Sequence, residues 1–191
     1  MLRALCVILA AFVSPAAAHA QPQDKAPWAA LVDGVAAAEI VLRDVCLPGI
    51  LERKSIGDLA LYERLTPMSR GLPATKPGDQ LWRLGSLTQV YAVAWQDGSC
   101  STYVDRGRAE ELREMAERTI LARPEGFVRG RSGPEGGGRV IRTVFCAKAG
   151  EERLMASVTT PNGSAQGTWA LSSTVYRAKG DSPLCQPSPD A

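Results

Sequence analysis

The chain has 191 residues, of which 45% are hydrophobic, and its formal net charge is +2. This length is enough to bury the core of one domain, and a charge so near zero does not favour binding to a polyanion such as nucleic acid. Arginine outnumbers lysine, and alanine and glycine are abundant, which indicates a GC-rich, bacterial coding sequence.

The N-terminal residues have the three parts of a secretory signal peptide. Arg3 supplies a short positive region, residues 4–13 form an apolar run, and the Ala-His-Ala at 18–20 fits the pattern that precedes cleavage. The apolar run is shorter than the roughly 20 residues that cross a bilayer. We therefore expect removal of residues 1–20, a flexible N-terminus over 21–27, no remaining membrane span, and a periplasmic or secreted protein.

His19 is the one histidine of the chain, and we expect it to leave with the signal peptide. Ser-His-Asp catalysis, Cys-His catalysis and zinc sites with histidine ligands would then be excluded, because each needs an imidazole. The sequence also lacks the G-x-S-x-G, P-loop and G-x-G-x-x-G motifs. The expectation is no catalytic residue, no metal and no cofactor.

The mature chain is expected to keep four cysteines, Cys46, Cys100, Cys146 and Cys185. An even number of cysteines in an exported protein predicts two disulfides. Three pairings are possible, and spacing alone does not choose among them; we favour Cys46–Cys100 with Cys146–Cys185. The absence of a C-x-x-C spacing argues against a metal site.

The first third of the chain has a helical pattern followed by a loop. Apolar residues at three- and four-residue steps predict a helix from Trp28 that ends at Pro48-Gly49. Ser55 is the expected N-cap of a second, shorter helix. Residues 66–79 hold three prolines and two glycines and are expected to form a long surface loop.

The middle of the chain changes to a strand pattern. Two β-rich runs on either side of Asp97-Gly98 predict a hairpin, since Asp-Gly between apolar runs is a strong turn signal. In the first run Tyr91, Val93 and Trp95 alternate with apolar residues of the opposite face. We therefore expect a central strand that is covered on both sides.

A regular helix and four β runs complete the pattern. Asp105 is the expected N-cap of that helix, and Pro124 and Gly126 end it. The order α(α)ββαββββ predicts an α+β fold, in which an antiparallel sheet of about five or six strands is covered by two or three helices. Sheets of the profilin-like and PAS-like kind have a comparable arrangement, which implies no function.

We expect one α+β domain over residues 28–178. The remaining residues, 179–191, are polar and rich in proline, and they form a C-terminal tail. Such a tail has little reason to be ordered unless a bond holds it. A disulfide through Cys185 would tether it to the domain.

Arginines on two neighbouring β runs form the candidate binding patch. By the two-residue period of a strand, Arg129 and Arg131 share a face. Like charges packed in this way repel unless an anion neutralises them, so the patch would suit a carboxylate- or phosphate-bearing partner. The alternative is a solvated sheet face with acidic neighbours. The patch consists of Arg129, Arg131, Arg139 and Arg142.

Together these patterns predict an exported, non-catalytic envelope protein that binds a small ligand or another protein, and no nucleic acid. The alternative is a histidine-free hydrolase of envelope glycans, which needs two carboxylates about 5–10 Å apart. A cavity with paired acids would favour hydrolysis, whereas an arginine-rich or apolar sheet face would favour binding. Four aromatic residues either line a groove or, as is commoner in strands, form core: Trp82, Tyr91, Trp95 and Trp169.

Overall fold

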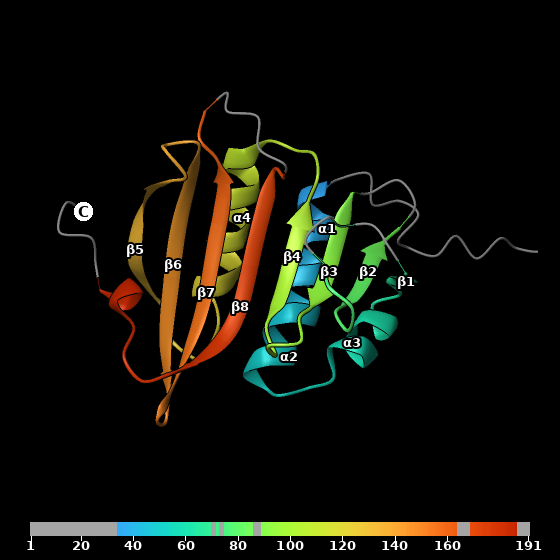
Figure 1. Ribbon diagram of the computed structural model, residues 1–191, viewed down its shortest axis with the longest axis horizontal. Coiled ribbons are helices and arrows are strands. Elements are labelled where there is room, and N and C mark those ends of the chain that lie inside the picture. The colour runs from blue at the N-terminus through green and yellow to red at the C-terminus, as the bar shows by residue number, and fades with distance from the viewer. Residues whose placement is uncertain (1–33, 70–71, 73–74, 86–88, 164–168, 187–191) are drawn as a thin grey trace, which may run out of the picture.

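The structure, a computed structural model, describes residues 34–69, 72, 75–85, 89–163 and 169–186. The predicted signal peptide and flexible N-terminus lie outside the described residues. One antiparallel sheet has the strand order β1-β2-β3-β4-β8-β7-β6-β5 (Figure 1). The strands are β1 Thr66–Met68, β2 Gln80–Leu84, β3 Val90–Ala94, β4 Cys100–Val104, β5 Val128–Glu135, β6 Val140–Ala149, β7 Glu152–Pro161 and β8 Leu171–Lys179.

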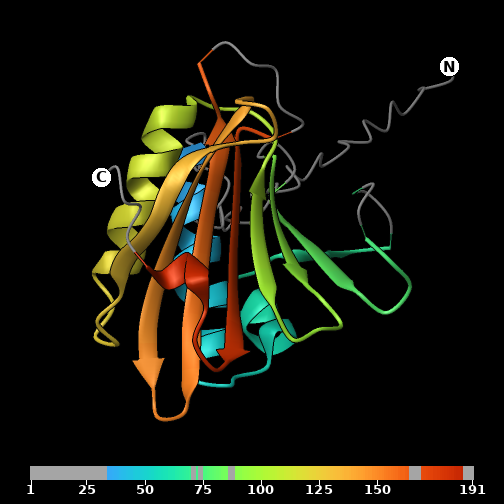
Figure 2. The same ribbon diagram turned by 60° about the vertical axis from the view of Figure 1, so that its left-hand side comes forward.

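The α-helices pack against one face of this sheet (Figures 1 and 2). A continuous helical segment runs along that face, and its middle part has the wider π-helical turn. A short 3-10 helix of the C-terminal tail lies on the opposite face. The helical elements are α1 Gly34–Ile40, η2 Val41–Cys46, α2 Leu47–Leu51, α3 Ile56–Tyr62, α4 Ala109–Leu121 and η3 Pro183–Cys185.

Strand alternation divides the apolar side chains between the two faces. The main core lies between the helices and the sheet, where Leu42, Leu112 and Phe145 are completely buried. Two smaller apolar clusters lie on the opposite face, one around Val93 and one around Met155. Within the described part of the chain, the helices therefore cover one face of the sheet, and smaller apolar clusters cover the two sides of the other face.

The prediction of five or six strands is wrong, because the sheet has eight. The two missed strands are β1, inside the predicted loop 66–79, and β2, just after it. β1 has three residues and includes Pro67, which an edge strand tolerates because no neighbour needs its missing N–H. The profilin-like and PAS-like comparison does not describe this eight-stranded sheet. The fold is still broadly α+β.

The strand order also has an internal symmetry. β1–β4 and β5–β8 are each a four-stranded meander preceded by helix, and they meet where β4 pairs antiparallel with β8. The sequence pattern shows no repeat that would reveal this arrangement. The junction places β4 and β8 in the middle of the sheet, with β3 and β7 beside them. β3 lies inside the sheet between β2 and β4, and apolar clusters cover both of its faces, as expected.

The favoured disulfide pairing is confirmed. Cys46–Cys100 joins η2 to β4 with Cα atoms 5.2 Å apart, and Cys146–Cys185 joins β6 to η3 with Cα atoms 5.7 Å apart. The C-terminal tail is thus tethered through Cys185, as expected. Two disulfides are compatible with an oxidising, extracytoplasmic compartment.

Helix ends agree with the sequence pattern in part. Ser55 is the N-cap of α3, where its hydroxyl accepts a hydrogen bond of 3.3 Å from the N–H of Asp58. The first helix does not end at Pro48-Gly49 but continues to Leu51. The π-helical turn before Pro48 explains this, because its wider repeat relieves the clash of a proline ring with the preceding turn.

The N-cap of α4 differs from the predicted one. Asp105 is not the N-cap of α4; Arg108 holds that position and makes no side-chain capping bond there. No helix within the described ranges is both long and apolar enough to cross a membrane.

Arg64 gives a stability prediction at the end of α3. It has φ 58°, and the N–H of Leu65 donates to the carbonyl of Ala60, as in a Schellman motif. We expect Arg64→Gly to be more stable than Arg64→Ala by about 1 kcal/mol, because glycine adopts this backbone conformation without a Cβ clash. Urea unfolding of the two variants measures the difference, and both remove the arginine side chain. Equal stability would contradict the prediction.

Candidate functional site

The face of the sheet opposite the helices carries a row of hydroxyl side chains. Ser101 on β4, Thr174 on β8 and Ser157 on β7 are successive cross-strand partners. In the adjoining row, Ser172 on β8 pairs with Thr159 on β7. Because side chains alternate along a strand, all five lie on this one face. These five residues are termed the hydroxyl floor.

The hydroxyl floor lies between two covered areas of the same face. On the β1–β3 side, the buried residues Leu72, Leu81 and Val93 form an apolar cluster. On the β6 side, Leu184 and Cys185 of the tethered tail pack over a second apolar cluster. Among the described residues, apolar clusters therefore cover both sides of the face, with a polar strip between them.

Aromatic side chains border the hydroxyl floor on its β3–β4 side. The ring centroids of Tyr103 and Trp169 are 5.2 Å apart, those of Tyr91 and Trp169 are 6.1 Å apart, and those of Trp95 and Tyr103 are 6.4 Å apart. All four side chains are only partly buried. They are termed the aromatic wall, and such edge-on contacts stabilise the cluster as a unit.

Hydrogen bonds attach the aromatic wall to the hydroxyl floor. The indole N–H of Trp95 donates to Oγ of Ser101 over 2.7 Å. Oγ of Ser101 is in turn 2.8 Å from Oγ1 of Thr174, where either hydroxyl can be the donor. This chain of bonds fixes the positions of both surfaces before any ligand arrives.

A cavity of about 410 Å³ opens at the end of the floor nearest the β3–β4 turn. Its volume is within the range of small-molecule sites. Two residues of the hydroxyl floor, Ser157 and Thr174, contribute to it. It is termed the groove cavity, and it is lined by Asp97, Ser99, Arg142, Ser157, Thr174, Tyr176 and Arg177.

The charged groups of the groove cavity differ in how fully they are engaged. Asp97 accepts hydrogen bonds from the N–H and the hydroxyl of Ser99, at 2.9 and 2.6 Å, so one of its oxygens holds the turn. Arg142 is 3.5 Å from Glu135, a distance beyond that of a good hydrogen bond, and its side chain is 29% exposed. The cavity therefore presents a partly satisfied cation.

Tyr176 forms part of the wall of the groove cavity and keeps its proton at neutral pH. Burial raises the pKa of its phenol above the ordinary value, while the positive charge of Arg142 acts in the opposite direction. A protonated phenol both donates and accepts hydrogen bonds. Tyr176 thus adds a fourth hydroxyl to those of Ser99, Ser157 and Thr174.

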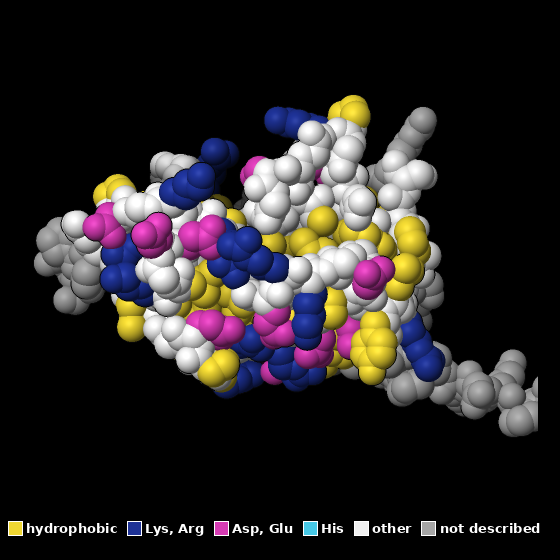
Figure 3. Space-filling view, turned by 90° about the horizontal axis from the view of Figure 1, so that it is seen from below, with side chains coloured by type: hydrophobic (Ala, Val, Ile, Leu, Met, Phe, Trp, Pro, Cys, Tyr) yellow, Lys and Arg dark blue, Asp and Glu magenta, His cyan; other side chains and the backbone are white. Residues whose placement is uncertain are grey.

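A second, larger cavity of about 570 Å³ lies at the end of the sheet, between α2, α3 and the β3–β4 turn. Its charged side chains already have protein partners: Glu152 lies 2.9 Å from Arg53 and 2.6 Å from Arg177, and Lys54 lies 2.7 Å from Glu52. Figure 3 views this end of the molecule, where basic and acidic side chains are interspersed around exposed hydrophobic ones.

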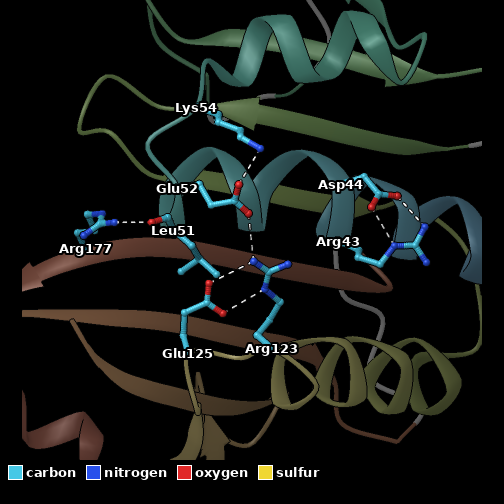
Figure 4. A network of polar contacts seen from close by, with 8 residues as sticks. All are labelled: Arg43, Asp44, Leu51, Glu52, Lys54, Arg123, Glu125 and Arg177. Atoms are coloured by element: carbon cyan, nitrogen blue, oxygen red, sulfur yellow. Dashed lines mark hydrogen bonds and ion pairs between the residues drawn. The ribbon is translucent and has the colours of Figure 1, made fainter.

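The ion pairs of that second cavity belong to a wider structural network. Arg177 donates to the carbonyl of Leu51, and Glu52 joins Lys54 to Arg123, which also contacts Glu125 (Figure 4). These contacts hold the end of α2 against β8 and α4. We therefore regard the smaller groove cavity as the better candidate site.

The four arginines of the predicted patch do not form one surface. Arg129 lies over the ring of Phe145, 6.0 Å from its centroid, and pairs with Glu117 of α4, so it belongs to the helix-covered face. Arg142 lies on the opposite face, in the groove cavity. Whether any of these arginines binds an anion stays a prediction.

The other two arginines lie toward the β5–β6 hairpin. Arg139 donates to the carbonyl of Gly136 within the turn, over 3.0 Å. Arg131 lies in an irregularity of β5, where the pairing register shifts between Arg129 and Ser132. β5 therefore has one more residue than β6 in this stretch. The extra residue interrupts the alternation that predicted a shared face for Arg129 and Arg131.

The aromatic residues that sequence singled out divide between the two faces. Trp82 is 5% exposed and belongs to the main core. Tyr91, Trp95 and Trp169 belong to the aromatic wall, joined there by Tyr103. The wall therefore has the position, at the edge of an open polar strip, that a groove lining needs.

Paired carboxylates do not occur in either of these two cavities. Among the described residues that line the groove cavity, Asp97 is the one carboxylate, and in the larger cavity it is Glu152. No group of three or more His, Cys, Asp or Glu side chains that could hold a metal occurs within the described ranges.

Comparison with protein-family models, with curated proteins and with solved structures gives no match.

Proposed function

We propose that the protein is an exported, non-catalytic binding protein of the bacterial envelope, periplasmic or secreted, that holds a small polar ligand in the groove cavity. The observation that carries the proposal is the hydroxyl floor. Five adjacent short side chains, each both donor and acceptor, lie between two covered areas of one sheet face; Ser101 and Ser157 are buried, and the other three are partly exposed. Short hydroxyl side chains offer hydrogen bonds and leave room for a ligand.

The composition of the groove cavity favours binding over hydrolysis. A histidine-free glycan hydrolase needs two carboxylates on opposite sides of the bond that it cleaves. The described lining of the groove cavity offers only Asp97, which is already bonded to Ser99. Hydroxyls with ordinary pKa values are poor nucleophiles unless a base activates them.

Replacing Thr174 by valine tests the proposal. The substitution keeps the shape of the side chain and removes its hydroxyl, so we expect a ligand of the groove cavity to bind about tenfold more weakly. The probes are a panel of neutral sugars, sugar acids, hydroxy acids and amino acids. Binding is detected first as a rise in melting temperature of the exported protein and then measured by calorimetry.

Ser173→Ala is the matched control. Ser173 is the neighbour of Thr174 in β8, is completely buried on the helix-covered face, and its hydroxyl has no hydrogen-bond partner. The control should bind each probe as the unsubstituted protein does. A probe that binds both variants with unchanged affinity would move the site elsewhere, and a panel without any binding probe would argue against a small polar ligand.

A further inference from the structure

We infer that the groove cavity selects a carbohydrate that carries a carboxylate, with Arg142 as the group that pairs with the acid. The inference rests on the proposed function, because it names the ligand class of the same cavity. It goes beyond that function in assigning one residue to charge selection and the hydroxyl floor to recognition of the sugar.

Charge complementarity singles out Arg142. The lining of the groove cavity includes two arginines and one carboxylate, Asp97. Arg177 is more fully engaged, since each of its three side-chain nitrogens donates a hydrogen bond, to Glu152 and to the carbonyls of Ile50 and Leu51 over 2.6–2.9 Å. Arg142 has only the 3.5 Å contact with Glu135, so its guanidinium retains N–H donors for an incoming acid.

A carboxylate suits this arginine better than a phosphate does. The planar guanidinium presents two parallel N–H groups that match the two oxygens of a carboxylate. One cation without a close ion-pair partner balances one negative charge, whereas a phosphate brings up to two charges and three acceptor oxygens. The other cation of the lining, Arg177, is already paired with Glu152 over 2.6 Å.

The remainder of the lining suits a polyhydroxylated ring. Ser157, Thr174 and Tyr176 carry hydroxyls that both donate and accept, which is what the hydroxyls of a sugar require of their partners. Arg142 and Thr159 are cross-strand partners, so the cation adjoins the hydroxyl floor. The partly exposed rings of Tyr176 and the aromatic wall supply apolar surface for the C–H face of a sugar.

Oligogalacturonides test the inference, since the same oligomers can be prepared with free or methyl-esterified carboxyl groups. Methyl esters keep every ring hydroxyl and remove the charge. By calorimetry at low salt, we expect the free acid to bind the exported protein about tenfold or more tightly than the ester. Arg142→Gln should reduce the affinity for the acid to that for the ester and leave the ester nearly unchanged.

Arg139→Gln is the control, because this substitution removes the same charge from the β5–β6 turn. Arg139 does not line the groove cavity. It should keep the preference for the acid. Equal binding of acid and ester would overturn the inference while leaving the proposed function in place, provided that Thr174→Val weakens both. Binding of neither oligomer would also overturn it, and the proposed function would then stand or fall on the wider panel. Circular dichroism confirms that each variant is folded.

Discussion

Replacing Cys46 and Cys100 together by alanine is expected to lower the free energy of unfolding by about 4 kcal/mol. The bridge closes a loop between residues 54 positions apart, and a loop of that length removes about this much conformational entropy from the unfolded chain. Both cysteines are completely buried between η2 and β4. Alanine is preferred to serine because it does not bury an unpaired hydroxyl there. Urea unfolding followed by circular dichroism measures the loss.

The second bridge provides the comparison for this experiment. Cys146–Cys185 closes a loop of similar length, with a separation of 39, but Cys185 lies beyond the last strand. Without the bridge the tail can detach while the sheet stays folded, so we expect a smaller loss of global stability and faster hydrogen exchange over residues 180–186. Four free thiols in the unreduced protein, found by mass spectrometry, would contradict both expectations.

Tail packing shows why that detachment would be local. A Cβ added to Gly130 on β5 would lie 2.5 Å from the carbonyl oxygen of Leu184, so the tail backbone lies directly against this glycine. Leu184 and Cys185 otherwise contact the small cluster around Met155, on the face away from the main core. Losing these contacts exposes a limited surface and leaves the helices in place.

Sequence patterns predicted elements that have a long apolar repeat or a clear turn signal beside them, and missed two short strands that have neither. The spacing of Leu112, Met115 and Ile120 was sufficient to predict α4, because a long helix repeats its apolar stripe several times. β2 has five residues, as β3 and β4 do, but it follows a segment rich in proline and glycine and lacks the Asp-Gly turn that indicated β3 and β4. The disulfide pairing was one of three possibilities that distance along the chain could not decide.

The candidate site was only partly visible in the sequence, for a physical reason. Ser172, Thr174 and Tyr176 occupy alternate positions in β8, but Ser173 and Arg177 on the other face are polar too, so the strand lacks a clear alternation of apolar and polar residues. Their importance depends on which strands lie beside β8, and its pairing with β4 joins residues about 70 positions apart. The four arginines are divided because Arg142 lies three residues from Phe145 in β6, on the opposite face from Arg129, and because the register shift in β5 breaks the expected alternation at Arg131.

Arg177→Met is the second substitution with a large expected effect, a loss of about 2–4 kcal/mol in the free energy of unfolding. The guanidinium donates to the carbonyl of Ile50 over 2.9 Å and to that of Leu51 over 2.7 Å, at the end of α2. Figure 4 shows the bond to Leu51. Carbonyls in a last helical turn lack intrahelical partners, and a cation there also balances the helix dipole. Methionine keeps the aliphatic volume of the side chain but cannot donate.

Arg53→Met is the matched control, because Arg53 also pairs with Glu152 but its side chain is 69% exposed. The bonds to the carbonyls of Ile50 and Leu51 come from Arg177 and would remain in this variant. Exposed ion pairs contribute little, so its urea midpoint should move far less than that of Arg177→Met. Equal losses would mean that the Glu152 contact, and not the carbonyl bonds, carries the effect.

The pH dependence of the Arg177→Met loss separates the two kinds of bond that Arg177 makes. The hydrogen bond from Arg177, followed by the charge of Arg53, lowers the pKa of Glu152 below its ordinary value. A lowered carboxyl pKa contributes stability that is present above the ordinary value, about 4.3, and is lost as the pH falls through the lowered one.

The difference in stability between the unsubstituted protein and Arg177→Met should therefore narrow below about pH 4. It should not vanish, because the bonds to the two carbonyls do not titrate. A difference that stays constant with pH would contradict the Glu152 bond, and one that disappears in acid would contradict the carbonyl bonds.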